Sequence, residues 1–139
     1  MNIKEQIKSD LKKIFKEEII EKKMCNIHFL LCNRINEPGI YIFKEKNEYC
    51  YVEIGDRGEV ENVTKSLEVK KILYKVYSNI TFNEAVAFSM NKRNENIDFR
   101  RLLFDKQLEL LKNIDEIYYN KRMEEIEEIL LNSPYKDNI

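Results

Sequence analysis

Apolar residues recur every three or four positions near the start of the chain, among lysine and glutamate. The positions are Ile3, Ile7, Leu11, Ile14, Phe15 and Ile19. This spacing places the side chains along one side of an α-helix. Residues 2–23 are therefore predicted to form a single amphipathic helix.

Apolar and polar residues begin to alternate after the pair Pro38-Gly39, which predicts strands. One predicted face carries Ile40, Ile42, Cys50, Val52 and Ile54, and the other carries Tyr41, Phe43, Tyr49 and Tyr51. This division requires a loop with an odd number of residues. Residues 45–47 supply three, and Asn47 suits the left-handed third position. A second turn at 55–58 and a return strand over 59–64 complete a three-stranded antiparallel meander.

Helical spacing returns at Ser66, which is predicted to cap a helix that continues to Ile80. Thr81 and Glu84 then match a capping box, in which each side chain bonds the other residue's backbone amide. This motif predicts a separate short helix that ends at Met90.

Two more helices are predicted, one over 98–111 and one from a capping box at 113–116 to just before Pro134. In the last helix, the residues predicted to face inward are Tyr119, Met123, Ile126 and Leu130. The predicted fold class is α+β: an N-terminal helix, a three-stranded antiparallel meander, and a C-terminal half of about four helices. The length predicts one domain spanning residues 1–139.

The charges nearly cancel, with 24 lysine and arginine against 25 aspartate and glutamate, for a net charge of -1. No overall basic field favours nucleic acid or anionic lipid, so neither is expected as a partner. The first residues are charged, unlike a signal peptide. The longest uncharged run, 24–33, is too short to span a bilayer. We therefore expect a cytoplasmic protein, and three cysteines without an export signal do not suggest a disulfide framework.

Four residues could in principle bind zinc: Cys25, His28, Cys32 and Cys50. Their spacing lacks the paired CxxC or HxxxH patterns of zinc sites, and their neighbours are apolar. Buried cysteine with no catalytic role is the simpler interpretation. Three glycines also leave little material for a phosphate-binding loop. We therefore expect no cofactor, no metal and no enzymatic activity, with a small zinc-dependent enzyme as one alternative.

The predicted meander carries a candidate binding surface. Its acidic residues are Glu53, Asp56, Glu59 and Glu61, with only Arg57 among them to offset their charge. Its aromatic residues are Tyr41, Tyr49 and Tyr51. Aromatic anchors beside a charged rim are typical of protein interfaces. The alternative is that a helix covers the tyrosine rings, since both faces of the ribbon are apolar.

Several motifs occur in a recognisable order: GIYIFKEKNEYCYVEIGDRGEV, LYKVY, Thr81-Phe82 with Ala85, Asp98-x-Arg100-Arg101-x-x-Phe104, Leu108 to Leu111, and EEIEEILLNSPYKDN. This order resembles immunity protein family 63 of bacterial polymorphic toxin systems. The resemblance runs from about Gly39 to Asp137, and its most specific part is the Asp-x-Arg-Arg signature. The sequence has Asp56-Arg57-Gly58 where the family pattern would have Glu-Arg-Gly. The first 38 residues are not part of the match.

The resemblance implies a non-enzymatic cytosolic protein that binds and blocks a cognate toxin domain, without identifying the toxin. Cations at a helix start oppose the helix dipole, so Arg100 and Arg101 are interpreted as a structural ion-pair network with Asp98. The main alternative is a nucleic-acid-binding antitoxin or regulator. Its phosphate patch would consist of Arg93, Arg100, Arg101 and Lys106.

Overall fold

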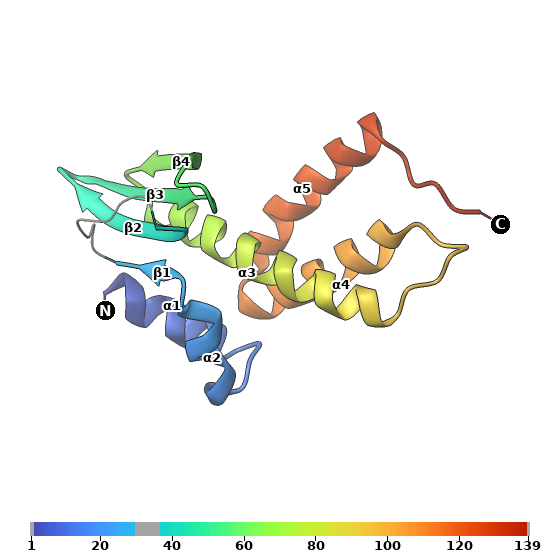
Figure 1. The fold of residues 1–139 in the computed structure, drawn as a ribbon, viewed down its shortest axis with the longest axis horizontal. Helices are drawn as coiled ribbons and strands as arrows, with labels where there is room; N and C mark the ends of the chain where they lie inside the picture. Colours follow the sequence, from blue (N-terminus) through green and yellow to red (C-terminus); the bar gives the residue numbers. More distant parts are fainter. Residues whose placement is uncertain (1, 30–36, 139) are drawn as a thin grey trace. The chain divides into compact units, whose positions relative to one another are not determined.

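The computed structural model describes residues 2–29 and 37–138, which form a mixed α+β fold with five helices and a four-stranded sheet (Figure 1). The chain divides into two compact units, Met1–Val76 and Tyr77–Ile139. The first contains two helices and the sheet, and the second is helical. Helix α3 (Val69–Asn91) begins in the first unit and ends in the second.

The first unit begins with two short helices, α1 (Ile3–Leu11) and α2 (Glu17–Met24). The prediction of one helix over 2–23 is therefore wrong. Residues 12–15 form turns in which two backbone amides bond to carbonyls three residues back. Lys16 is extended, with φ -69° and ψ 149°, and starts the next helix. No glycine or proline marks this break, so the apolar spacing gave no signal for it.

The sheet has four strands in the order β1-β2-β3-β4 (Figure 1). They are β1 (Ile27–His28), β2 (Gly39–Glu45), β3 (Glu48–Ile54) and β4 (Val60–Ser66). Strands β2 to β4 are antiparallel, as predicted, and the return strand lies close to the predicted range 59–64. Strand β1 adds a parallel pairing with β2 that the sequence analysis did not predict. Two residues are too few to show alternation.

The hairpin between β2 and β3 has a two-residue loop, Lys46 and Asn47, because Glu45 pairs directly with Glu48. Lys46 has φ 58° and is the one described non-glycine residue with positive φ. The predicted three-residue loop with Asn47 in the left-handed position is therefore wrong. One residue fewer in the loop shifts the register and exchanges the faces of the following strand.

The exchanged faces place Tyr51 opposite Ile42, and Val52 opposite Tyr41. Residues directly opposite on antiparallel strands share a face, so the predicted separation of tyrosines from aliphatic residues is wrong. Either register buries apolar side chains, which is why the alternation alone did not decide between them. Tyr41 and Tyr51 are both fully buried, at 0% exposure.

Gly39 occupies a position that other residues would strain. Its φ is +144°, and Ile40 beside it donates a backbone hydrogen bond to the carbonyl of Asn26 at 2.9 Å. A Cβ atom at Gly39 would lie 2.7 Å from that carbonyl oxygen and 3.2 Å from Nε2 of His28. The close approach of β1 to β2 therefore depends on the missing side chain.

The two helices predicted over 66–80 and 81–90 form one helix, α3, which continues into the second unit. The Thr81 hydroxyl donates to the Tyr77 carbonyl at 2.6 Å instead of capping a new helix. This bond to the residue four positions earlier is available to threonine inside a helix. The capping-box prediction was therefore wrong, and Ser66, predicted as the cap, instead accepts a hydrogen bond from the Glu68 amide at 3.0 Å.

The remaining helices are α4 (Phe99–Ile114) and α5 (Glu116–Asn132). Asp98 caps α4, accepting a bond from the Arg100 amide at 2.9 Å. Asp115 caps α5, two residues beyond the predicted Asn113. The predicted inward side of α5 is confirmed, because its residues pack in or against one apolar cluster. That cluster consists of Ala85, Leu103, Phe104, Leu108 and Ile126.

A buried polar network joins the three helices of this unit. Gln107 is fully buried, and its amide nitrogen donates to the Ser78 carbonyl at 3.1 Å and to the Thr81 hydroxyl at 3.3 Å. Its amide oxygen accepts from Nε of Arg122 at 2.8 Å. Arg122 also pairs with Glu125 at 3.2 Å. A buried amide without such partners would cost stability, so these bonds fix the alignment of the helices.

Within residues 2–29 and 37–138, no helix combines the length and the hydropathy that crossing a bilayer requires.

We predict that Gly39→Ala lowers the free energy of unfolding by about 1–3 kcal/mol, through backbone strain and collision with a carbonyl. Gly55→Ala is the matched control. The atoms nearest its new Cβ would be the flexible carboxylate ends of Glu59 and Glu61, and no positive φ is involved. Chemical denaturation of both variants measures the difference. An equal loss in both would contradict the assignment of strain to Gly39.

Candidate functional site

Four carboxylates gather at the turn between β3 and β4, and we call Glu53, Asp56, Glu59 and Glu61 the acidic turn. The Gly58 amide donates to the Gly55 carbonyl, and the Gly55 amide donates to the Glu59 carbonyl, both at 2.9 Å. The carboxylate of Glu59 accepts from the Arg57 amide at 2.9 Å. The sequence-predicted acidic residues are thus held together by a closed turn.

The acidic turn is crowded with like charge. Loss of hydration, followed by the neighbouring Glu59 carboxylate and a hydrogen bond to it, raises the pKa of Glu61. Glu53 and Asp56 raise the pKa of Glu61 further. In the part of the chain that the structure describes, no ion pair brings a lysine or arginine to any of the four. Asp56, Glu59 and Glu61 are exposed, so the turn presents negative charge to solvent.

The tyrosines of the candidate surface are less accessible than expected. Tyr41 is buried, and the centre of its ring lies 4.8 Å from that of the stacked His28 ring. Its hydroxyl donates a hydrogen bond to the Glu37 carbonyl at 3.0 Å. Tyr51 is also buried and donates to Glu53, and burial raises the pKa of its hydroxyl. Of the two alternatives that the sequence left open for these rings, exposure to a partner is wrong for Tyr41 and Tyr51, because both are fully buried. Tyr49 is half-buried, with the Lys44 ammonium 5.2 Å from the ring centre.

The candidate zinc ligands that the structure describes do not form a metal-binding cluster. Cys25 is exposed and Cys50 is buried, where burial raises the pKa of its thiol. His28 stacks on a tyrosine, and Cys32 lies outside the described residues. No group of three potential ligands among the described histidine, cysteine, aspartate and glutamate residues could hold a metal ion.

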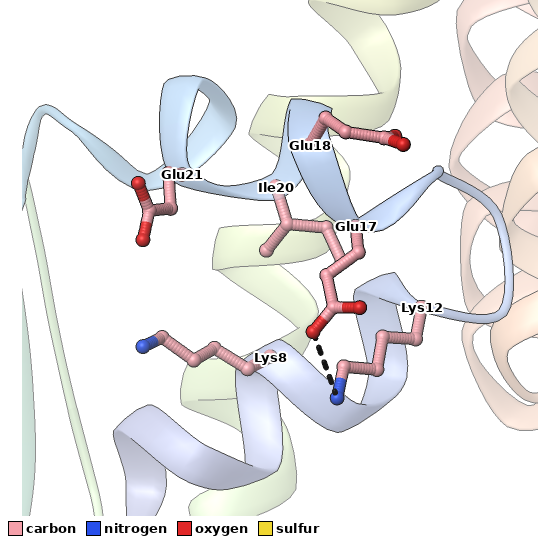
Figure 2. Close-up of a pocket in the computed structure, with 6 residues that line it drawn as sticks. All are labelled: Lys8, Lys12, Glu17, Glu18, Ile20 and Glu21. Carbon is pink, nitrogen blue, oxygen red and sulfur yellow. Dashed lines mark ion pairs between the residues drawn. The ribbon is translucent and has the colours of Figure 1, made fainter.

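A hollow of about 530 Å³ lies between the first two helices (Figure 2). Its lining consists of Lys8, Lys12, Glu17, Glu18, Ile20 and Glu21. The ammonium of Lys12 and the carboxylate of Glu17 are 3.9 Å apart. Positive and negative groups therefore offset each other around one aliphatic side chain. Sequence reasoning missed this hollow because its two walls were predicted to be one continuous helix.

Arg100 connects the start of α4 to the segment after α5. Its guanidinium pairs with Asp98 at 2.9 Å and donates to the carbonyls of Ser133 and Pro134, each at 2.9 Å. The Asp98 carboxylate also accepts from the Lys136 amide at 2.8 Å. The cation at this helix start is thus offset by an adjacent carboxylate and by two carbonyl groups.

Arg101 binds the same segment. Its guanidinium contacts the Asp137 carboxylate at 2.8 Å and lies 4.0 Å from the centre of the Tyr135 ring. Asp137 in turn accepts from the Asp98 amide at 2.7 Å. The sequence alone did not assign a role to Asp137, although it lies in the last of the recognised motifs, EEIEEILLNSPYKDN. We call Asp98, Arg100, Arg101, Tyr135 and Asp137 the clamp.

The clamp strongly favours ionised carboxylates. Hydrogen bonds from the Arg100 side chain and from the Lys136 and Arg100 amides lower the pKa of Asp98. The hydrogen bond from Arg101, followed by that from the Asp98 amide, lowers the pKa of Asp137. Two of the three guanidiniums of the proposed phosphate patch, those of Arg100 and Arg101, therefore already have carboxylate partners. Lys106, a third member of that patch, pairs with Glu109 at 3.6 Å, and the fourth, Arg93, is exposed.

The model of one protein family, Immunity protein 63, matches residues 45–128, more than half of the chain. The chain belongs to this family. The match includes the acidic turn and the first three members of the clamp, and it ends before Tyr135 and Asp137. No curated protein and no solved structure matches this immunity protein.

We predict that Arg101→Ala lowers the melting temperature of this immunity protein by a few degrees, because Asp137 and Tyr135 lose their shared cation. Arg93→Ala is the matched control. Arg93 is exposed between α3 and α4. Thermal denaturation followed by circular dichroism makes the comparison. A variant of unchanged stability that fails only to bind the toxin would contradict a structural role for Arg101.

We also predict that the clamp weakens in acid. A carboxylate with a lowered folded-state pKa stabilises the protein fully above its unfolded-state pKa of about 3.9. That contribution disappears as the pH falls below this value towards the folded-state pKa. Asp98→Asn keeps a helix cap but removes the titrating charge. The free energy of unfolding of Asp98→Asn should fall less than that of the wild-type protein between about pH 5 and about pH 2. Equal falls in the two proteins over this range would refute the prediction.

Proposed function

We propose that this immunity protein binds a cognate toxin domain and neutralises it by blocking the active site or substrate surface of the toxin. Membership of the Immunity protein 63 family supports this proposal. The inhibition is stoichiometric and non-enzymatic, and it takes place in the cytoplasm, where the toxin would act. Residues 1–139 act as one immunity-protein domain, with α3 running from one compact unit into the other.

The acidic turn is the proposed contact with the toxin. The observation that supports this assignment is the gathering of four carboxylates at one closed turn without a paired cation in the described part of the chain. Loss of hydration and then repulsion raise the pKa of Glu61, and a basic partner at this turn would relieve the repulsion. Tyr49 lies on β3 and can add contact area at its half-buried ring. Tyr41 and Tyr51 would support the surface from within the sheet.

Charge explains how such a surface could block a toxin. Toxins that act on nucleic acid need basic groups where the phosphates bind. Carboxylates presented at the same place satisfy those groups and exclude the substrate. Complementary charge of this kind mainly speeds association, and close-packed contacts then slow release.

Helix α5 presents a rival acidic surface. Glu124, Glu127 and Glu128 are exposed on it, while Glu125 pairs with Arg122. These carboxylates are spread along a helix, whereas the carboxylates of Glu59 and Glu61 in the acidic turn lie together beside Gly55. The crowded site gains more from a cationic partner, which favours the acidic turn.

We predict that Asp56→Lys with Glu59→Lys weakens binding of the cognate toxin domain more than tenfold, equivalent to about 1.4 kcal/mol. Glu127→Lys with Glu128→Lys on α5 is the matched control of equal charge change. Isothermal titration of each variant, after circular dichroism has confirmed its fold, measures the effect. Affinity within about threefold of wild type for the first pair, with a loss for the second, would move the interface to α5.

A further inference from the structure

Strand β4 is an outer strand of the sheet (Figure 1). It pairs with β3 along one side, and none of its seven residues is buried. Val60 is 61% exposed and Val63 is 50% exposed, and the following Leu67 is 69% exposed. A strand edge with exposed apolar side chains offers unpaired backbone groups to another strand.

The sequence of β4 is complementary to itself when two copies run antiparallel. If Val63 lies opposite Val63 of a second copy, Glu61 lies opposite Lys65 and Asn62 lies opposite Thr64. Both pairs occur twice, because the arrangement is twofold symmetric. Every charge in this register faces an opposite charge, and the central pair is apolar. Pairs of this kind stabilise neighbouring antiparallel strands.

The two charged residues lack such partners within the described chain. The register of β3 and β4 pairs Ile54 with Val60 and Glu53 with Asn62, which leaves Glu61 without a partner on β3. Its carboxylate lies instead among like charges of the acidic turn. Lys65 is exposed, and none of the described carboxylates forms an ion pair with it. A second copy would supply each of them with an opposite charge.

We propose that β4 pairs with β4 of a second copy of this chain, antiparallel and centred on Val63, so that two four-stranded sheets join edge to edge. Edge strands of monomeric proteins are commonly protected by a register shift or a lysine, and β4 has both. Protection does not explain three exposed aliphatic side chains along the same edge. The contact involves only a seven-residue strand from each copy, so the interface is small. The two copies therefore associate weakly and dissociate reversibly.

Two charge-reversal variants, one at Glu61 and one at Lys65, test the proposal on the free protein. Glu61→Lys places two lysines opposite each other, and Lys65→Glu places two glutamates opposite each other, so each variant should raise the dimer dissociation constant at least tenfold. An equimolar mixture of the two variants should dimerise again, since every pair then regains opposite charge. Sedimentation equilibrium from low micromolar to near-millimolar concentration measures all three samples.

The controls change the same charges elsewhere. Glu127→Lys on α5 and Lys22→Glu on α2 alter exposed residues outside β4 and should leave the dimer unchanged, alone and mixed. A monomeric wild-type protein throughout the concentration range would overturn the proposal. So would a dimer that tolerates both β4 variants, or a mixture that fails to restore it. If the free protein is monomeric and Lys65→Glu, which lies outside the acidic turn, weakens toxin binding, the edge belongs to the toxin.

This experiment is independent of the proposed function, because it needs no toxin. The toxin titration changes Asp56 and Glu59, which leaves the central Glu61–Lys65 pairs intact. Failure of one proposal is therefore distinguishable from failure of the other.

Discussion

The two-residue loop of Lys46 and Asn47 decides which side chains of the sheet share a face. By pairing Glu45 with Glu48, it places Tyr51 beside Ile42 and Tyr41 beside Val52. Each face thereby receives one fully buried tyrosine. The rings of Tyr41 and Tyr51 are therefore packed in the interior and cannot contact a partner directly. The sheet leaves Asp56, Glu59 and Glu61 of the acidic turn and Val60 and Val63 of β4 exposed, so the length of one loop affects which side chains remain at the surface.

Polar side chains perform a similar organising role in the helical unit. The side-chain amide of Gln107 on α4 donates hydrogen bonds to α3 and accepts one from Arg122 on α5. These bonds exclude other helix alignments that an apolar core alone would tolerate. At the start of α4, Asp98 caps the helix while Arg100 beside it bonds to carbonyls more than thirty residues later. The unfavourable position of the arginines is thus compensated by groups distant in sequence.

The sequence pattern located the strands and the later helices because burial imposes a period on apolar residues. It failed where several local structures bury the same side chains. The break after Leu11 has no glycine or proline, and Thr81 can cap a helix or bond within one. The acidic turn was predictable because its members are close in sequence. Asp137 as the partner of Arg101 was not, since only the fold brings residues 36 positions apart into contact.

The clamp also constrains how relatives of this protein can diverge. Its arginines lie inside the region that defines the family, whereas Tyr135 and Asp137 lie beyond it. A relative that loses the acidic residue at position 137 would keep an arginine without its carboxylate, so substitutions at the two positions should covary. The exposed carboxylates of the acidic turn bear no such linkage to distant residues. The acidic turn can therefore vary in sequence while the helical unit keeps its inherited pairing.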